Sequence, residues 1–435
     1  MPDLTAPKST RPGGKPLCKT DGYSAARFFR SLGPGLVTGA ADDDPSGIAT
    51  YSIAGAQLGT AMLWTAWVTW PLMAAVPFMC ARVGMVTGMG LARALKRKIP
   101  RPLVVAAVGA LTIANTINIA ADLAGMADAA VDLVGGRPVL FAAVLGAAIA
   151  IVTVGCTYAR FAAILKWLAA SLLAYVATAF ITRPDWGAVW RALVPAWPHG
   201  RDAWATLVAL FGTTISPYLF FWQASQEVEE EKGQERRNIG ARSGASKAEL
   251  MDRRVDVVAG TFLSNAVMFF VILTCAMTLH RAGVRNIETS HQAAEALRPL
   301  AGRAAAALYT VGLVTVGLLA IPTLAGSSAY ALAETFNWRQ GLGERFAEAR
   351  EFYLVVLGSI AAGIALVAVH ISPVKALFWS AVINGVLAPF LLGGLLVVAC
   401  DRKLMCGQPT PLAARIIVGA AMVVMFGAAA AMFLV

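Results

Sequence analysis

Apolar stretches long enough to cross a lipid bilayer recur along the whole chain. Clear examples are residues 63–80, 103–119, 139–154 and 352–369. A transmembrane helix needs about 20 consecutive, mainly apolar residues. Charged residues make up only 14% of the chain, whereas about 25% is usual in soluble domains. The sequence therefore predicts an all-α polytopic membrane protein.

Eleven transmembrane spans are predicted from this pattern. They cover residues 31–57, 61–86, 103–133, 138–156, 159–182, 203–226, 255–280, 304–333, 352–371, 374–399 and 412–434. Residues 1–30, which precede the first span, are rich in Pro, Gly, Lys and Arg and contain no apolar run. A cleaved signal peptide would need such a run. We therefore expect this segment to be a flexible cytoplasmic tail.

The distribution of positive charge predicts the orientation. With the N-terminus inside, 27 of the 36 Lys and Arg residues fall on inward segments, with dense clusters at 93–101 and 232–254. Short cytoplasmic connections of membrane proteins carry such an excess. We therefore expect a cytoplasmic N-terminus and, because the number of spans is odd, a C-terminus outside. The Ala- and Arg-rich composition is typical of a bacterial inner-membrane protein. The net charge of +11 then reflects orientation, and no nucleic-acid partner is expected.

Two of the spans are interrupted by proline and polar residues. The first span contains the run Asp-Asp-Asp-Pro-Ser-Gly at 42–47, and the sixth contains Thr-Thr-Ile-Ser-Pro at 213–217. Proline removes a backbone donor and clashes with the preceding turn. The breaks occupy matching places in two halves, which is typical of transporters that bind their substrate at the bilayer midplane between inverted repeats. We predict repeats at 31–182 and 203–399, with 412–434 as an added span.

Three consecutive aspartates inside an apolar span are costly. One aspartate at the centre of a span costs about 2.5–3.5 kcal/mol, so such residues indicate a water-filled cavity or a bound cation. Unwound backbone adds free carbonyl oxygens. Carboxylates and carbonyls together suit hard cations such as Mg²⁺, Ca²⁺ and Mn²⁺. Asp44 is the foremost candidate ligand. The alternative is that Asp44 only caps the half-helix that follows it.

Other polar residues near the breaks are weaker candidates. Asp42 and Asp43 are expected to line a vestibule or to lie behind the ligands. Asn384, in the tenth span, is either a ligand or a hydrogen-bond partner between helices. The hydroxyl groups at the sixth-span break either face the ion or bond back to their own helix: Thr213, Thr214 and Ser216.

Several short motifs follow one another in a recognisable order. The first span contains Gly33-Pro34-Gly35, then the break at Asp44-Pro45, then Ala49-Thr50 and Ala54-Gly55-Ala56, and the third span contains Asp122-Leu123-Ala124. These motifs resemble those of the Nramp divalent-metal transporters, and the resemblance covers about residues 31–400.

The resemblance implies a LeuT-type fold with five-plus-five inverted repeats and no enzymatic activity. The divalent metal ion would be the transported substrate, so no cofactor is expected. The lipid bilayer would be the protein's surroundings, with no obligate protein partner. The resemblance also implies main-chain carbonyl ligands at Ala41 and Thr213, and it brings Asp122 close to the site.

The breaks depart from the family pattern. The family's first break reads Asp-Pro-Gly-Asn, in which Asp and Asn both bind the metal, but Gly47 stands here in place of the Asn. The family's sixth break reads Met-Pro-His, and here it is Ser216-Pro217-Tyr218. Fewer side-chain ligands and no sulfur imply a partly hydrated ion, because Mg²⁺ keeps several waters and takes few carboxylates. The pattern resembles the Nramp-related magnesium transporters, with Gly47 at the edge of the site.

The family's proton-relay positions are also altered. An acidic residue follows Asp-Leu-Ala in the family, and here Gly125 does; the family's paired Arg aligns with Arg350-Glu351. We therefore predict a magnesium importer, with manganese as a second substrate, that is not coupled to protons. One alternative is a proton-coupled manganese or iron importer. Another is an amino-acid or organic-solute symporter on the same fold, although the aspartates would repel a substrate carboxylate.

Overall fold

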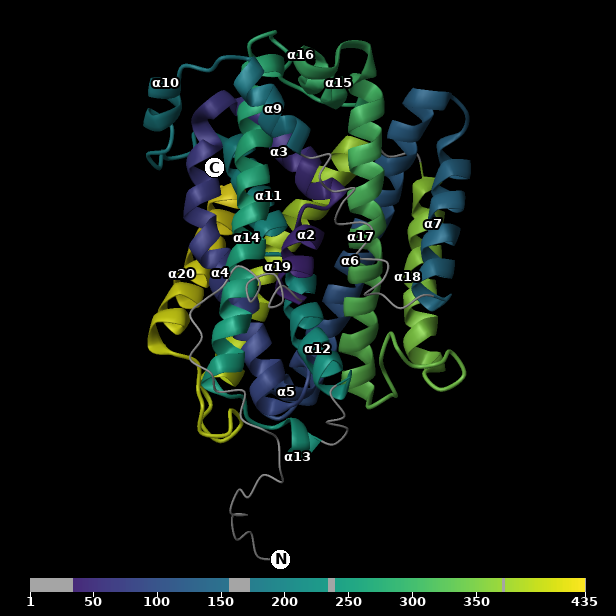
Figure 1. The fold of residues 1–435 in the computed structure, drawn as a ribbon, viewed down its shortest axis with the longest axis vertical. Helices are drawn as coiled ribbons and strands as arrows, with labels where there is room; N and C mark the ends of the chain where they lie inside the picture. The colour runs from purple at the N-terminus through teal and green to yellow at the C-terminus, as the bar shows by residue number, and fades with distance from the viewer. Residues whose placement is uncertain (1–33, 156–172, 234–238, 370–371, 435) are drawn as a thin grey trace, which may run out of the picture.

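The computed structural model of the chain describes residues 34–155, 173–233, 239–369 and 372–434, and the regular structure in these ranges is helical. Long helices run roughly side by side along the long axis (Figure 1). Within these ranges, nine helical stretches are long and apolar enough to cross a membrane. The chain is therefore an integral membrane protein. The predicted tail at 1–30 and much of the predicted fifth span lie outside the described residues, so the count of eleven spans stays a prediction.

The long helices follow the predicted spans closely. In the first half they are α2 (Pro34–Asp42), α3 (Pro45–Leu58), α4 (Leu63–Thr87), α6 (Arg101–Val134), α7 (Pro138–Gly155) and α9 (Leu173–Ile181). In the second half they are α11 (Arg201–Thr214), α12 (Pro217–Gly233), α14 (Lys247–Cys275), α17 (Ala305–Phe336), α18 (Arg350–Val367) and α19 (Pro373–Cys400), followed by α20 (Leu412–Leu434).

Short helices occupy the connections. They are η1 (Gly59–Met62), α5 (Leu91–Leu95), α10 (Trp186–Arg191), α13 (Ile239–Arg242), η3 (Ala276–His280), α15 (Ser290–Ala294), η4 (Glu295–Leu297), α16 (Arg298–Ala301) and η5 (Gly302–Ala304). Helices α5 and α13 lie at one end of the molecule, which we call the basic end because Arg93 of α5 and Arg242 of α13, from the two predicted inward clusters, belong to these helices. Helices α10, α15 and α16 lie at the opposite end, toward which α20 runs (Figure 1).

Both predicted breaks are present. In the first span, α2 ends at Asp42 and α3 begins at Pro45. Proline suits the first position of a helix because its missing N–H would have no partner there. In the sixth span, α11 ends at Thr214 and α12 begins at Pro217. Each of these spans therefore consists of two half-helices, and the unwound residues of each are buried.

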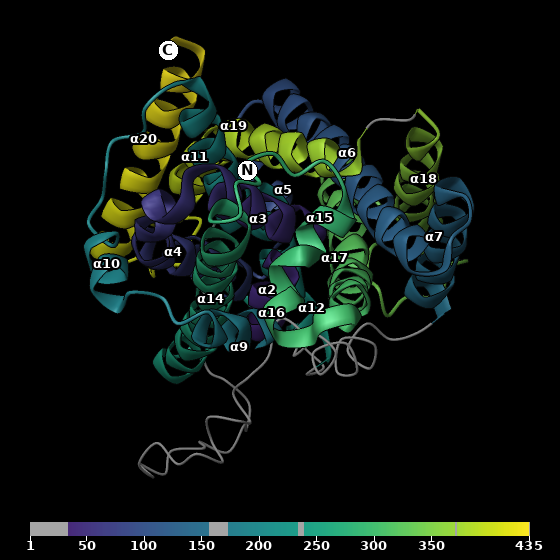
Figure 2. The same cartoon turned by 90° about the horizontal axis from the view of Figure 1, so that it is seen from above.

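Glycines bring the broken spans very close to their neighbours. A Cβ atom on Gly212 of α11 would lie 2.0 Å from the Ala381 carbonyl oxygen of α19, and one on Gly39 of α2 would lie 2.4 Å from the Gly260 carbonyl carbon of α14. Small residues allow such close approach of helix backbones in membranes. The first span is thus packed against the seventh and the sixth against the tenth. Seen from above, α7 and α18 stand together at one edge of the bundle and α20 at the opposite edge (Figure 2).

A buried ion-pair network ties α2 to α12 and α14. The Arg253 guanidinium contacts Glu227 at 2.7 Å and Asp256 at 2.7 Å. The same Asp256 carboxylate accepts a 2.8 Å hydrogen bond from the Gly35 backbone N–H at the start of α2, and Gln223 donates to Glu227 at 2.7 Å. Buried charges are tolerated where they are paired and hydrogen-bonded in this way. The N-terminal end of the first broken span is therefore anchored to the seventh span.

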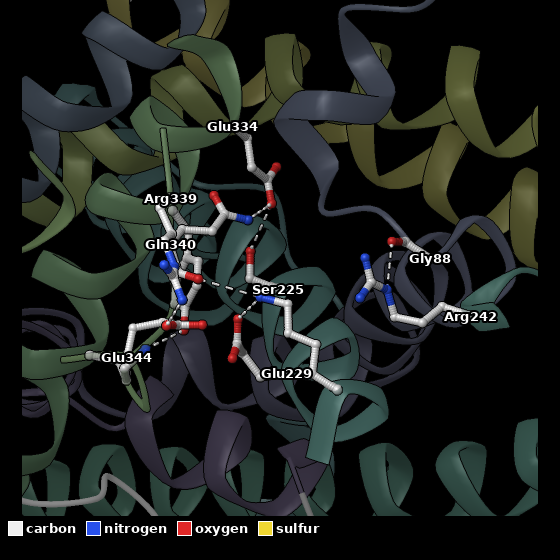
Figure 3. A network of polar contacts seen from close by, with 11 residues as sticks. Gly88, Ser225, Glu229, Arg242, Glu334, Arg339, Gln340 and Glu344 are labelled. Atoms are coloured by element: carbon white, nitrogen blue, oxygen red, sulfur yellow. Dashed lines mark hydrogen bonds and ion pairs between the residues drawn. The ribbon is translucent and has the colours of Figure 1, made fainter. Parts of the chain in front are cut away.

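A second polar network lies at the basic end (Figure 3). Glu334, near the C-terminus of α17, is buried. Its carboxylate accepts hydrogen bonds from the Gln340 amide at 3.1 Å and the Ser225 hydroxyl of α12 at 3.5 Å, and from the Arg93 backbone N–H of α5 at 3.1 Å. These contacts join α5, α12 and α17, so the basic end is closed by packed polar groups in this conformation.

Candidate metal site

Asp44 lies between the two half-helices of the first span and is buried. Its Oδ1 accepts hydrogen bonds from the Ser46 hydroxyl at 2.6 Å and from the Gly47 backbone N–H at 2.7 Å. Its Oδ2 accepts one from the Asn118 amide at 3.0 Å. The contact with Gly47 makes Asp44 the N-cap of α3, which is the alternative role considered above. A carboxylate can accept about four hydrogen bonds, and the Ser46 backbone N–H is a further donor near this one, so a cation would take the place of one of these donors.

Asp42 and Asp43 are buried at the same break. Asp42 ends α2, and the Ser264 hydroxyl of α14 lies 3.2 Å from its Oδ2 and 3.0 Å from Oδ1 of Asp43. The remaining oxygen of Asp42, Oδ1, has no hydrogen-bond partner among the described residues. The two side chains are 0% and 4% exposed. Neither side chain is therefore open to solvent, and the predicted vestibule stays a prediction.

The hydroxyl groups of the sixth-span break bond back to their own helix. The Thr213 and Thr214 hydroxyls contact the Leu210 carbonyl at 3.1 and 2.8 Å, and the Ser216 hydroxyl lies 2.8 Å from the Thr213 carbonyl. Such back-bonding was the alternative considered for these residues. Ser216 also lies close to the Asp42 carboxylate. The Thr213 carbonyl, a predicted ligand, is thus near the site but already hydrogen-bonded.

Tyr218 joins the two broken spans. Its phenol O–H donates a 2.9 Å hydrogen bond to the Ala41 carbonyl, from α12 to α2. Ala41 is the other residue predicted to offer a main-chain ligand. A carbonyl oxygen has two lone pairs, so it can accept from Tyr218 and still face a cation. The phenol therefore positions this carbonyl beside the break.

Gly47 lies at the edge of the site and offers no side chain. A Cβ atom built on it would lie 3.4 Å from the Asp42 carbonyl oxygen, 3.5 Å from Oδ1 of Asp44 and 3.5 Å from Cζ of Tyr51. These are ordinary van der Waals distances, so a Cβ atom fits here without displacing the backbone. Its side chain would start directly beside the Asp44 carboxylate.

The third span contributes residues that sequence reasoning weighed less or missed. Asn118 of α6, which donates to Asp44, was not among the candidates. Asp122 lies one turn further along α6 and close to Asp44. It is 0% exposed, and neither of its carboxylate oxygens has a hydrogen-bond partner among the described residues. Asn384 of α19 is also buried, and its Oδ1 has no partner in the described part of the chain.

The donor atoms at the breaks are all oxygen or amide groups. They come from carboxylates, main-chain carbonyls, hydroxyls, a phenol and an amide, without sulfur or imidazole among the residues just described. Within the described ranges, no three His, Cys, Asp or Glu side chains converge into a preformed metal cage. A site with few protein ligands and hard donors suits an ion that retains some of its water.

The fold and the position of this site define a class of protein. Two spans broken at matching places, with buried carboxylates at one break, are the arrangement of a LeuT-type transporter. The family model of Natural resistance-associated macrophage protein-like proteins, Nramp, matches residues 35–435. The chain belongs to the Nramp family, as the sequence motifs predicted.

Curated relatives and solved structures agree with this assignment. The chain is 30% identical over 307 residues to the "Divalent metal cation transporter MntH" of Yersinia enterocolitica, covering 68% of this chain and 71% of that protein. It is 29% identical over 328 residues to the MntH of Pectobacterium carotovorum, covering 72% and 75%.

Two solved structures show the same fold at low identity. The Eremococcus coleocola manganese transporter has a TM-score of 0.77 at 15% identity, covering 94% of this chain and 87% of that one. Mhp1, a nucleobase-cation-symport-1 family transporter, has a TM-score of 0.54 at 13% identity, with 92% of both chains covered. The predicted fold class is thereby confirmed.

Proposed function

We propose that this protein imports divalent metal cations across a bacterial inner membrane and prefers Mg²⁺, with Mn²⁺ as a second substrate. The observation that carries the proposal is the donor set at the two breaks. Asp44 offers a carboxylate, Ala41 a carbonyl and Ser216 a hydroxyl, and Tyr218 lies next to them. Oxygen donors of this kind favour Mg²⁺ over softer metals. The curated relatives named above are divalent metal cation transporters, which supports the substrate class.

We propose that the membrane potential, without protons, drives this uptake. With the N-terminus in the cytoplasm, a potential of 100 mV supplies about 4.6 kcal/mol per divalent ion, twice the value for a single charge. The position after Asp-Leu-Ala is Gly125, and a Cβ atom there would lie 2.8 Å from Cδ1 of Leu377 in α19. A longer acidic side chain would have to displace Leu377. This packing supports the proposal that position 125 no longer takes part in a proton relay.

The second candidate is a proton-coupled manganese or iron importer. Two findings favour it: the relatives are named MntH, and the solved structure with a TM-score of 0.77 is a manganese transporter. Asp43 and Asp122 are also buried carboxylates that can accept protons. An organic-solute symporter is disfavoured, because the buried aspartates would repel a substrate carboxylate.

The proposal is tested by ion uptake into proteoliposomes that contain the purified protein. Mg²⁺, Mn²⁺ and Ca²⁺ are compared at equal concentration, with a metal-sensitive dye and a pH-sensitive dye inside and the potential clamped. Liposomes with the Asp44→Asn variant are the matched control. We expect potential-driven Mg²⁺ uptake with a flat pH trace. Manganese uptake that excess Mg²⁺ leaves unchanged, accompanied by internal acidification, would establish the second candidate instead.

A further inference from the structure

Asp122 is a buried carboxylate that lacks the contacts such a group requires. It is fully buried in α6, and neither Oδ1 nor Oδ2 has a hydrogen-bond partner among the described residues. Removing a carboxylate from water without any compensating contact costs several kcal/mol. Asp44, the residue before α3, is the charged group with the largest electrostatic effect on the Asp122 carboxylate. The Ser46 backbone N–H also lies close to this carboxylate. The orphaned oxygens therefore face the break of the first span.

A bound cation would stabilise the negative charge at the break of the first span. Asp42, Asp43, Asp44 and Asp122 are all buried. Asp44 has donors from Ser46, Gly47 and Asn118, Asp42 and Asp43 both lie beside the single Ser264 hydroxyl, and Asp122 has only the nearby Ser46 backbone N–H. Among the described residues, none of the four carboxylates forms an ion pair with a Lys or Arg. A divalent ion between Asp44 and Asp122 would balance two negative charges from opposite sides.

Asn118 is the second polar side chain of α6 at this break. Its Nδ2 donates to Asp44 at 3.0 Å, while its Oδ1 lies 2.7 Å from the Ser380 hydroxyl of α19. That hydroxyl also lies 2.8 Å from the Leu377 carbonyl. A hydroxyl has a single proton, so it donates either to Oδ1 of Asn118 or to the Leu377 carbonyl.

Rotation of the Asn118 amide by half a turn is compatible with the second of these choices. The Ser380 hydroxyl then donates to Leu377 and accepts from Nδ2 of Asn118, and Oδ1 of Asn118 points toward the Asp44 carboxylate. Two oxygens facing each other repel unless a cation lies between them. A bound cation would therefore favour the rotated amide, whose oxygen would face the ion.

We infer that the third span completes the metal site, with the Asp122 carboxylate as a second negatively charged ligand and the Asn118 amide oxygen as a neutral one. This inference rests on the proposed metal transport and assigns ligands to it. Asp122 and Asn118 lie four residues apart on α6, so they occupy the same face of the helix one turn apart. The amide that Gly47 lacks is thus supplied from α6, and the ion is held between α3 and α6.

The test is titration calorimetry of the full-length protein in nanodiscs with Mg²⁺ and Mn²⁺, using variants of α6. The test variants are Asp122→Asn and Asn118→Leu. The controls are Asp128→Asn, whose carboxylate accepts from the Ser290 N–H at 2.9 Å, and Asn115→Leu, whose amide contacts the Leu324 carbonyl at 3.2 Å. Changes that merely misorient a metal ligand lower affinity by about 10–100-fold. We expect each test variant to weaken binding at least about 10-fold and each control to leave it unchanged.

Thermal unfolding separates a ligand from a structural residue. Asp122→Asn removes an unpaired buried charge, so the metal-free protein should unfold at the same or a higher temperature, and the stabilisation by added Mg²⁺ should shrink. Diffraction from crystals of the unaltered protein soaked in Mn²⁺ gives an anomalous peak whose position is independent of any variant. We expect that peak in direct contact with the Asp122 carboxylate.

Each result decides between defined alternatives. If Asp122→Asn binds metal like the parent, or the anomalous peak lies away from α6, the assignment of α6 ligands is wrong. If in addition Asp44→Ala still binds metal, the proposed transport site itself is wrong. If Asp122→Asn binds metal normally but loses a pH dependence of uptake, Asp122 carries protons and is not a ligand.

Discussion

Replacing Asp44 by Asn separates the two roles that this residue has in the structure. The carboxylate caps α3 through the Gly47 N–H and is the foremost candidate metal ligand. Asn caps a helix as well as Asp does, whereas Ala does not. The Asn variant therefore removes the charge and keeps the cap, and Asp44→Ala removes both. Comparison of the two neutral variants cancels the contribution of the buried charge.

The expected magnitudes differ in the two measurements. Loss of an N-cap costs about 1 kcal/mol, so Asp44→Ala should be less stable than Asp44→Asn by about that amount. Both variants lose the ligand, so both should bind Mg²⁺ at least about 10-fold more weakly than the parent, since misorienting a ligand alone costs about 10–100-fold. Uptake at low Mg²⁺ should fall to the level of empty liposomes in both.

The assays are thermal unfolding followed by fluorescence and Mg²⁺ uptake into proteoliposomes, with equal amounts of inserted protein. Ser46→Ala is a matched control, because it removes a 2.6 Å contact to Asp44 but keeps the carboxylate and the Gly47 contact. It should retain uptake. If Asp44→Asn transports Mg²⁺ at the parent rate while Asp44→Ala is destabilised, Asp44 is a cap only, and the ligand assignment fails.

Three further changes test the site and its scaffold. Ser216→Met with Gly47→Asn should shift uptake from Mg²⁺ toward Mn²⁺ in competition assays, because sulfur favours the softer ion and a Cβ atom fits at position 47. Unchanged selectivity would contradict the role given to these positions. Arg253→Ala should lower the free energy of unfolding by about 3–5 kcal/mol, since it leaves Glu227 and Asp256 buried without the guanidinium. Its control is Arg254→Ala, which changes an exposed residue and should unfold like the parent. Gly212→Ala should lower the free energy of unfolding by about 1–3 kcal/mol, because it overpacks α11 against α19. Its control is Gly109→Ala, whose Cβ meets nothing within 4 Å. Equal melting temperatures of the two variants would refute the argument.

The sequence predicted the breaks well because their cause is local. Pro45 and Pro217 remove backbone hydrogen bonds wherever the chain packs, and the half-helices end within a few residues of them. The candidate ligands Asp44 and Ala41 also lie at the break itself, so their position near the site followed from chain connectivity.

Contacts between distant spans could not be predicted in this way. Asn118 reaches Asp44 across 74 residues, and periodicity alone does not say which face of α6 turns toward α3. A polar Asn in an apolar span was a visible signal, but most such residues join helices, as Asn115 does in this structure. The orientation of the Thr213 and Ser216 hydroxyls could not be predicted for the same reason. Whether each hydroxyl bonds back to its helix or faces an ion depends on the packing around the break.

The anchor of α2 has a consequence for biosynthesis. The Gly35 N–H contacts a carboxylate that is 221 residues further along the chain. At about 5–20 residues per second, the ribosome needs roughly 10–45 seconds to make that partner. Helix α6 is made earlier, because Asn118 follows Asp44 by 74 residues, but throughout this interval a span with three aspartates has no seventh span to cover it, and each aspartate costs about 2.5–3.5 kcal/mol in lipid. The nascent first span must therefore stay beside the translocation machinery, or at the membrane surface, until the second half of the protein arrives.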